Sequence, residues 1–336
     1  MGEGLNNEMM RENLLGRTGL LVSEIAFGAG VTGGILIKGE ETAAVRALNR
    51  ALAIGINWID TAALYGSGAS EAAIGRHINS LDPQPHVSTK VRIEREEMHD
   101  IPGAIERSLV ASLERLNLER VALYQLHNQL GEAIGDRPVL SPEQVLGADG
   151  VADTFDKLKE QGLFLASGMT ATGETAAILD VIESSRFDCA QVYYNAINPS
   201  AGWLRAHKNW RAQDFSGILA ACFRQNMGVL NIRIFAGGPL AKPARPERLS
   251  VLTSGTDVDN EVRCAAAVRN ALGTQFGSPA QVALRFVLGN HDISSRVIGV
   301  ADVRDLDEAL QAVEAGPLPK EAVEKLERLW ATDFRN

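Results

Sequence analysis

The chain has little cysteine and no long apolar run. Its three cysteines, Cys189, Cys222 and Cys264, are odd in number and share no short spacing, which argues against a disulfide framework or a zinc-binding set. We expect buried free thiols and a reducing compartment. The polar first residues lack the apolar segment of a secretory signal, and no apolar run approaches the roughly 20 residues that span a bilayer. The sequence therefore predicts a cytoplasmic protein without a membrane partner.

Positive charge is also scarce. Lys and Arg number 33 against 42 Asp and Glu, a net charge of −9. Binding to a phosphate backbone requires clustered cations, so nucleic acid is not an expected partner. The six histidines are scattered, without the His-x-x-x-His or carboxylate pairing of a metal site. No nucleophile elbow for Ser-His-Asp catalysis is present either. We expect neither a resident metal nor hydrolase chemistry of that type.

What the chain does contain is a regular alternation of short apolar runs and amphipathic segments. The alternation favours one closed α/β barrel, a (β/α)8 TIM barrel, over an open sheet, with residues 1–336 forming a single domain. Strands are predicted at 22–27, at the start of 56–65, and at 87–89, 121–127, 163–168, 189–193, 228–232 and 296–299. Helices are predicted at 40–53, from 70 onward, and at 102–116, 151–159, 174–184, 216–224, 258–272, 278–288, 303–314 and 319–330.

Several connections are unusual. Segments 128–150, 198–211 and 233–255 exceed ordinary barrel connections, so we expect long loops over the barrel mouth. The glycine-rich segment 28–39 matches neither the Rossmann nor the P-loop spacing, which favours a plain strand-to-helix loop at the rim of the site.

Polar side chains follow three successive predicted strands. Asp60 ends the first, with Tyr65 shortly after it, Lys90 ends the second, and His127 ends the third. Because the carboxyl ends of barrel strands meet at one face, where barrel enzymes keep their chemistry, we expect these four to lie together. Singly they could be a helix cap, a rim tyrosine, a solvated lysine and a buried histidine. As an ordered set they favour proton transfer.

These residues also carry a family resemblance. The segments NWIDTAALYG, SEAAIG, STK, QLHN, LKEQGLFLASGMT, QVYYN, RIFAGGPL and IGVADVRDLDEAL follow one another along nearly the whole chain. In this the chain resembles the aldo-keto reductases, (β/α)8 barrels that move a hydride between a nicotinamide and a carbonyl. The resemblance implies that 14–22 form an N-terminal hairpin closing the bottom of the barrel, and that the long loops lie on the catalytic face.

The same resemblance assigns the catalytic roles. Tyr65 would be the acid/base, although an ordinary tyrosine, with a pKa near ~10, is a poor base at neutral pH. The Lys90 ammonium would favour the phenolate, and Asp60 would hold Lys90 charged and oriented. His127 would donate a hydrogen bond to the carbonyl or hydroxyl oxygen of the substrate.

The resemblance also implies a bound NAD or NADP. Arg233 stands where relatives stack an aromatic ring on the nicotinamide, and a guanidinium plane can stack as well. Gly299 and Asp305 stand where NADP-specific relatives place a Lys and an Arg. Asp305 would repel the 2′-phosphate and accept from ribose hydroxyls, which favours NAD, while Arg304 leaves NADP open. The resemblance implies Gly28 at the nicotinamide end of the cofactor, and Thr170 and Gln191 as partners of the nicotinamide carboxamide. After Arg233, residues 235–240, with Phe235 and Gly237, would supply backbone amides along the pyrophosphate. The implied residues at the adenosine end are Gly299, Arg304, Asp305 and Glu308.

The resemblance implies that the substrate is a small sugar or carbonyl compound. Trp203, Arg205 and Trp210, in segment 198–211, offer rings and donors that suit a sugar, or they belong to a solvated loop. The segments RIFAGGPL and IGVADVRDLDEAL are most similar to the sugar-oxidising branch of the family. This branch includes L-fucose, L-galactose and D-threo-aldose 1-dehydrogenases. Oxidation of an aldose at C1 to its lactone is therefore the leading hypothesis. The alternatives are an NADPH-dependent aldehyde or ketone reductase and a cofactor-binding docking subunit of the potassium-channel β type. Oligomeric state stays open.

Overall fold

The protein is described by a computed structural model over residues 10–131, 138–243 and 252–335. Parts of two predicted loops, 132–137 and 244–251, and the N-terminal residues 1–9 lie outside the described residues. Within the described residues, no helix combines the length and apolar character needed to cross a lipid bilayer.

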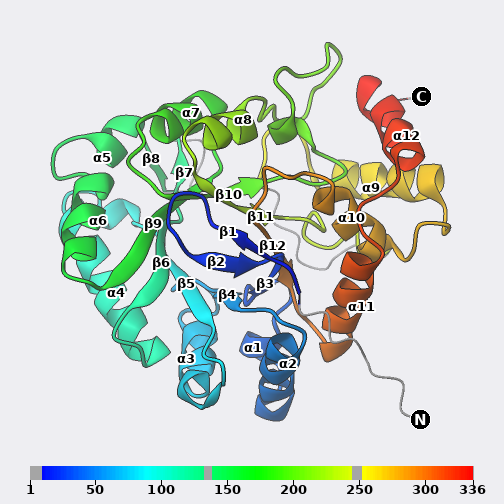
Figure 1. The fold of residues 1–336 in the computed structure, drawn as a ribbon. Helices are drawn as coiled ribbons and strands as arrows, with labels where there is room; N and C mark the ends of the chain where they lie inside the picture. The colour runs from blue at the N-terminus through cyan, green and yellow to red at the C-terminus, as the bar shows by residue number, and fades with distance from the viewer. Residues whose placement is uncertain (1–9, 132–137, 244–251, 336) are drawn as a thin grey trace, which may run out of the picture.

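Eight parallel strands close into a barrel that helices surround (Figure 1), as predicted. Around the barrel the strands are β3 (Ile25–Gly28), β4 (Trp58–Asp60), β5 (His86–Val91), β6 (Val121–Leu126), β9 (Phe164–Ala171), β10 (Cys189–Tyr193), β11 (Gly228–Ile232) and β12 (Ser295–Gly299). The longer helices are α2 (Glu41–Ala53), α3 (Ala69–Gly75), α4 (Ile101–Leu116), α6 (Val151–Glu160), α7 (Thr175–Glu183), α8 (Ile218–Arg224), α9 (Val258–Leu272), α10 (Pro279–Leu288), α11 (Val303–Glu314) and α12 (Lys320–Ala331).

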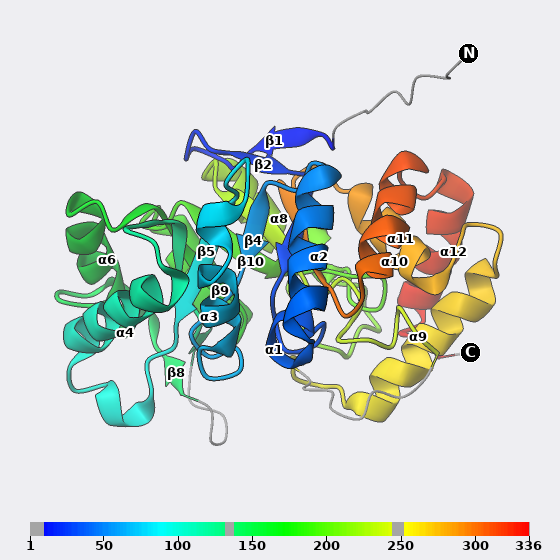
Figure 2. The same ribbon diagram turned by 90° about the horizontal axis from the view of Figure 1, so that it is seen from below.

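The predicted N-terminal hairpin is confirmed, but the predicted strand 22–27 is wrong as a single element. β1 (Glu12–Leu14) and β2 (Leu21–Ser23) pair antiparallel across one end of the barrel (Figure 2). The barrel strand β3 begins at Ile25. Ser23 explains the break, because its backbone N–H donates to Asn57 Oδ1 and its hydroxyl donates to Ile25 O. These side-chain hydrogen bonds replace the backbone hydrogen bonds of a sheet at the point where the chain passes from the hairpin to the barrel.

Segment 128–150 is also more ordered than predicted. It contains the short parallel pair β7 (Gln129–Leu130) and β8 (Val139–Leu140), followed by α5 (Pro142–Leu146). Ser141 and Gln144 form a capping box with Pro142 in the first turn, a start signal that the sequence carries. Likewise, the rim segment 28–39 contains a short helix, α1 (Ile35–Lys38).

The barrel interior has an apolar lower layer. Trp58 is its largest side chain and is completely buried, as is Cys189; all three cysteines are buried free thiols, as predicted. The layer consists of Leu15, Val22, Ala26, Trp58, Ala122, Leu123, Ala166, Cys189 and Leu230. Because side chains alternate along a strand, residues two positions further on, such as Asp60 after Trp58, enter the next layer toward the mouth.

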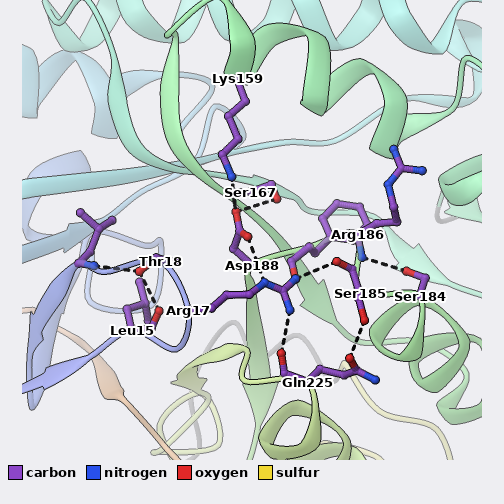
Figure 3. Close-up of polar contacts among 12 residues, drawn as sticks. Leu15, Arg17, Thr18, Lys159, Ser167, Ser184, Ser185, Arg186, Asp188 and Gln225 are labelled. Carbon is purple, nitrogen blue, oxygen red and sulfur yellow. Dashed lines mark hydrogen bonds and ion pairs between the residues drawn. The ribbon is translucent and has the colours of Figure 1, made fainter.

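The hairpin is attached to the barrel through Arg17 and Asp188 (Figure 3). Arg17 donates to the backbone oxygens of Ser185 and Gln225, at 2.8 and 2.7 Å, and pairs with Asp188 Oδ1 at 3.4 Å. Asp188 Oδ2 accepts from Lys159 Nζ at 2.7 Å. Burial raises the pKa of Asp188, but the bond from Lys159 and the other donors outweigh it, so the pKa lies below its ordinary value.

Asp188→Asn should therefore destabilise the fold by about 1–3 kcal/mol at neutral pH. A depressed folded-state pKa stabilises the protein above about pH 4, and this contribution is lost as the pH falls through the folded pKa. The difference from wild type in urea unfolding should accordingly shrink in acid. Asp149→Asn, which removes an exposed pair with Lys157, is the matched control and should cost little. Equal losses in the two variants would contradict the role of Asp188.

Candidate active site

The centre of the site is a buried ion pair between neighbouring strands. Lys90 Nζ lies 2.7 Å from Asp60 Oδ2, and the two side chains are 0% and 4% exposed. Nζ also donates to the Thr61 backbone oxygen at 2.7 Å and to the Tyr65 hydroxyl at 3.4 Å. An ammonium has three N–H donors, so each has a partner and the third is aimed at the phenol.

The Asp60 carboxylate is held in place by side chains from three other strands. Its Oδ1 accepts from the Ser88 hydroxyl at 2.7 Å, the Gln191 amide at 2.8 Å and the Gln125 amide at 3.3 Å. Ser88 in turn accepts from the Trp58 indole N–H, which links this polar layer to the apolar layer beneath it. The position of Lys90 is therefore fixed by strands around much of the barrel.

Lys90 keeps its charge despite complete burial. Burial lowers its pKa, but the Asp60 carboxylate and the Tyr65 oxygen raise it, and the net shift is upward. A fixed positive charge thus faces the oxygen of Tyr65 and would stabilise negative charge on it.

His127 follows β6 and lies beside Tyr65. The two rings meet edge to face, with centroids 5.7 Å apart. Burial, together with the charges of Lys90 and Arg92, lowers the pKa of His127 to about 3, so the ring is neutral at physiological pH. Its Nδ1 atom is buried and has no hydrogen-bond partner among the described residues. A neutral imidazole carries one donor and one acceptor. His127 can therefore donate a hydrogen bond to a substrate oxygen without adding a second positive charge beside Lys90.

The predicted nicotinamide residues lie next to this group. Thr170 of β9 and Gln191 of β10 are register partners, and the Thr170 hydroxyl is buried without a hydrogen-bond partner in the described chain. Such an orphaned hydroxyl suits a carboxamide ligand. Gln191, which we predicted only as a cofactor contact, also donates to Asp60. The residues present therefore fit a nicotinamide at this place.

The predicted pyrophosphate segment follows β11. Arg233, Ala236 and Gly237 have φ values of 61°, 52° and 76°, a backbone conformation that occurs in anion-binding turns. The Ala236 N–H donates to Arg233 O within this turn. Arg233 itself lies within electrostatic reach of Glu261 on α9, a carboxyl whose pKa is raised by burial to about 7 in spite of Arg233. Phe235 is half-buried at the same turn.

A cavity of about 400 Å³ lies at the predicted adenosine end. It is lined by Leu240, at the end of the predicted pyrophosphate segment, and by Gly277 and Ser278, which directly precede α10. Ser278 donates a hydrogen bond to Glu308, so Glu308 lies at the edge of this cavity. The dimensions and position suit the nucleoside half of a dinucleotide.

Two other predicted adenosine residues have contacts that the sequence analysis did not foresee. Asp305 Oδ2 accepts from the backbone N–H groups of Ala301 and Asp302 at 2.8 and 2.9 Å, which forms a capping box at the start of α11. Arg304 is exposed and pairs with Asp302 at 2.9 Å. Both side chains are thus engaged locally, and their roles toward a cofactor stay predictions.

Gly28 and Gly299 are paired at the ends of β3 and β12. A Cβ on Gly28 would come within 2.7 Å of Ile298 O, so close strand packing requires glycine there. Gly28 is also the register partner of Asp60. The closely packed Gly28–Gly299 pair therefore lies beside Asp60 at the mouth of the barrel.

The predicted substrate residues do not join the catalytic group. Trp203 and Trp210 pack edge to face, 5.0 Å apart, and Trp203 also contacts Trp330 of α12. Arg205 is exposed. Among the described residues, no contact joins these three side chains to Tyr65 or His127. The structure therefore gives the two tryptophans a packing role, and their contact with a substrate stays a prediction.

Across the described parts of the chain, no group of three or more His, Cys, Asp or Glu side chains is arranged to hold a metal ion. The sequence analysis missed Ser88, Gln125 and Arg92, which surround the predicted four. Ser88 and Arg92 lie two residues before and after Lys90, and Gln125 lies two residues before His127. Because side chains alternate along a strand, this spacing indicates that they face the same side as the predicted residues.

A closed (β/α)8 barrel with an Asp, Tyr, Lys and His at its strand ends defines an oxidoreductase site of the nicotinamide-dependent type. The Aldo/keto reductase family model matches residues 24–331, and the chain belongs to this family of NAD(P)H-dependent oxidoreductases. L-galactose dehydrogenase from Arabidopsis thaliana is 25% identical over 89% of this chain and 86% of its own. Aflatoxin B1 aldehyde reductase member 2 from Rattus norvegicus is 23% identical over 82% of this chain and 77% of its own.

Solved structures give the same fold. The holo form of an aldo-keto reductase from Bacillus halodurans superimposes with a TM-score of 0.73 at 22% identity, over 96% of this chain and 97% of its own. An aldo-keto reductase from Klebsiella pneumoniae in complex with NADPH gives a TM-score of 0.70 at 18% identity, over 96% of each chain.

Tyr65→Phe should lower turnover by roughly a hundredfold or more, because it removes the phenolic oxygen that we predict to exchange the proton. Cofactor affinity, measured by fluorescence titration, should change little. Tyr124→Phe is the control, because it removes a buried phenol oxygen that donates to Ile105 O away from the site. Equal weakening of turnover and cofactor binding in Tyr65→Phe would contradict the acid/base assignment.

Proposed function

We propose that the protein oxidises an aldose at C1 to its lactone, with hydride transfer to NAD or NADP and Tyr65 as the base. The single observation that carries this proposal is the Lys90 ammonium, whose three donors join Asp60, Thr61 and Tyr65 in a buried site. The similarity to an L-galactose dehydrogenase favours a sugar substrate.

The residues divide the chemistry among them. The oxidised nicotinamide, when bound, supplies the hydride acceptor. Tyr65 accepts the proton of the C1 hydroxyl as the carbon loses its hydride, and Lys90 stabilises the negative charge on the phenolic oxygen. The neutral ring of His127 donates to the C1 oxygen and fixes its position. Asp60 holds Lys90 in place. Thr170 and Gln191 would orient the nicotinamide carboxamide.

The same arrangement supports carbonyl reduction, in which Tyr65 donates its proton. The similarity to an aflatoxin aldehyde reductase favours this second candidate. A small sugar or carbonyl compound is the proposed partner in both cases. The three buried free thiols agree with the predicted cytoplasmic, reducing compartment.

The first test is nicotinamide absorbance with purified protein, NAD⁺ or NADP⁺ and a panel of free aldoses. We expect the reduced-cofactor band to grow with at least one aldose, and the lactone to appear in equal amount. No reduction with any aldose, combined with NADPH consumption in the presence of simple aldehydes, would replace the proposal by the reductase.

For the cofactor, we propose a preference for NAD because Asp305 would repel a 2′-phosphate. Asp305→Arg should raise the ratio of NADP to NAD affinity by about tenfold, the worth of one charge-assisted hydrogen bond. Asp305→Asn removes the charge but keeps an oxygen for the capping box, and it separates loss of repulsion from gain of attraction. An unchanged ratio in both variants would mean that Asp305 does not face the cofactor.

A further inference from the structure

Arg92 lies one layer above the catalytic lysine. In the register of β5 and β6, Lys90 is the partner of Gln125 and Val91 is the partner of Leu126. One step further, Arg92 comes beside His127, and His127 N donates to Val91 O at 2.7 Å. Because side chains alternate, Arg92 follows Lys90 on the inner side of the barrel, toward the mouth.

The surroundings of Arg92 differ from those of Lys90. Lys90 is completely buried, whereas the Arg92 side chain is 32% exposed. Its charge is nonetheless close enough to His127 to help lower the pKa of that ring. Arg92 therefore belongs to the open part of the site, next to the ring proposed to hold the reacting oxygen.

The guanidinium is held by one edge only. Nε donates to Glu94 Oε1 at 2.8 Å, and Nη2 donates to the same oxygen. Glu94 is itself fixed by a capping box with Glu97. Among the described residues, Nη1 has no hydrogen-bond partner, so an oriented pair of N–H donors stays available. Because Glu94 balances the charge, a neutral hydroxyl suits these donors.

We propose that Arg92 is a substrate-binding residue that donates from Nη1 to a hydroxyl neighbouring the reacting carbon, and that it thereby selects 2-hydroxylated substrates over plain aldehydes. The proposal rests on the proposed function and assigns its substrate class: sugars or hydroxyaldehydes with an oxygen beside the reacting carbon. It replaces Arg205, which lies exposed on loop 198–211, as the guanidinium that recognises the substrate.

The test compares Arg92→Met with wild type on an aldose and on the matching 2-deoxyaldose. Wild type should favour the aldose, and Arg92→Met should lower kcat/KM for the aldose by roughly tenfold to hundredfold, mainly through KM. The kcat/KM for the 2-deoxyaldose should fall much less, so the kcat/KM values of the two substrates become nearly equal. Cofactor affinity should stay unchanged, which also shows that the variant folds.

Two further variants sharpen the comparison. Glu94→Gln weakens the restraint on Arg92 and should raise KM for the aldose by a smaller factor. Arg224→Met removes an exposed charge from α8 that pairs with Glu183, and it should leave kcat/KM unchanged for both substrates. Equal losses for the aldose and the 2-deoxyaldose in Arg92→Met would overturn the proposal, because they would mean that Arg92 acts only through His127.

If wild type oxidises no aldose, the proposed function fails but Arg92 is still tested. The comparison then uses NADPH-dependent reduction of glycolaldehyde and acetaldehyde, which differ by the same hydroxyl. A preference for glycolaldehyde that disappears in Arg92→Met supports the role of Arg92 in a reductase. The same preference in wild type and variant, or none in wild type, overturns it.

Discussion

The burial of the Asp60–Lys90 ion pair is the constraint on which the rest of the site depends. Removing two charges from water costs several kcal/mol per ion, and this cost is offset only when every donor and acceptor is satisfied. Here Thr61 and Tyr65 take the remaining donors of Lys90, and Ser88, Gln125 and Gln191 donate to Asp60. The same bonds that stabilise the buried pair place the Tyr65 oxygen against a fixed cation, so the stability of the site and its chemistry have one origin.

A closed barrel makes such a pair possible. The apolar layer around Trp58 fills the lower interior, and the hairpin, attached through Arg17 and Asp188, covers it from below. In barrels of this type the strands form the scaffold and the loops at the mouth vary, so the fold alone does not identify the substrate.

The predictable part of the structure follows from local patterns. β10, β11, α9 and α11 begin and end where the apolar runs and cap residues predicted. The errors have physical causes. The break between β2 and β3 depends on Asn57, which is 34 positions from Ser23, and the bond from Gln191 to Asp60 joins residues 131 positions apart; no local pattern reveals either. Asp305 illustrates the opposite case, in which a local pattern is present but is not used. Its spacing from Asp302 is that of a capping box, whereas the sequence analysis gives Asp305 a cofactor role alone.

The direction of the reaction is not set by the central residues. In the proposed mechanism Tyr65 would accept or donate a proton and Lys90 would stabilise its oxygen in either direction, because microscopic reversibility requires the same groups to act both ways. His127 stays neutral in both. What separates an aldose dehydrogenase from an aldehyde reductase must therefore lie outside this group, in the charge at the adenosine end and in the donors that meet a substrate hydroxyl. Asp305 and Arg92 are the residues that we propose for these two roles, and in the described part of the chain neither makes a hydrogen bond to the buried Asp60–Lys90 pair.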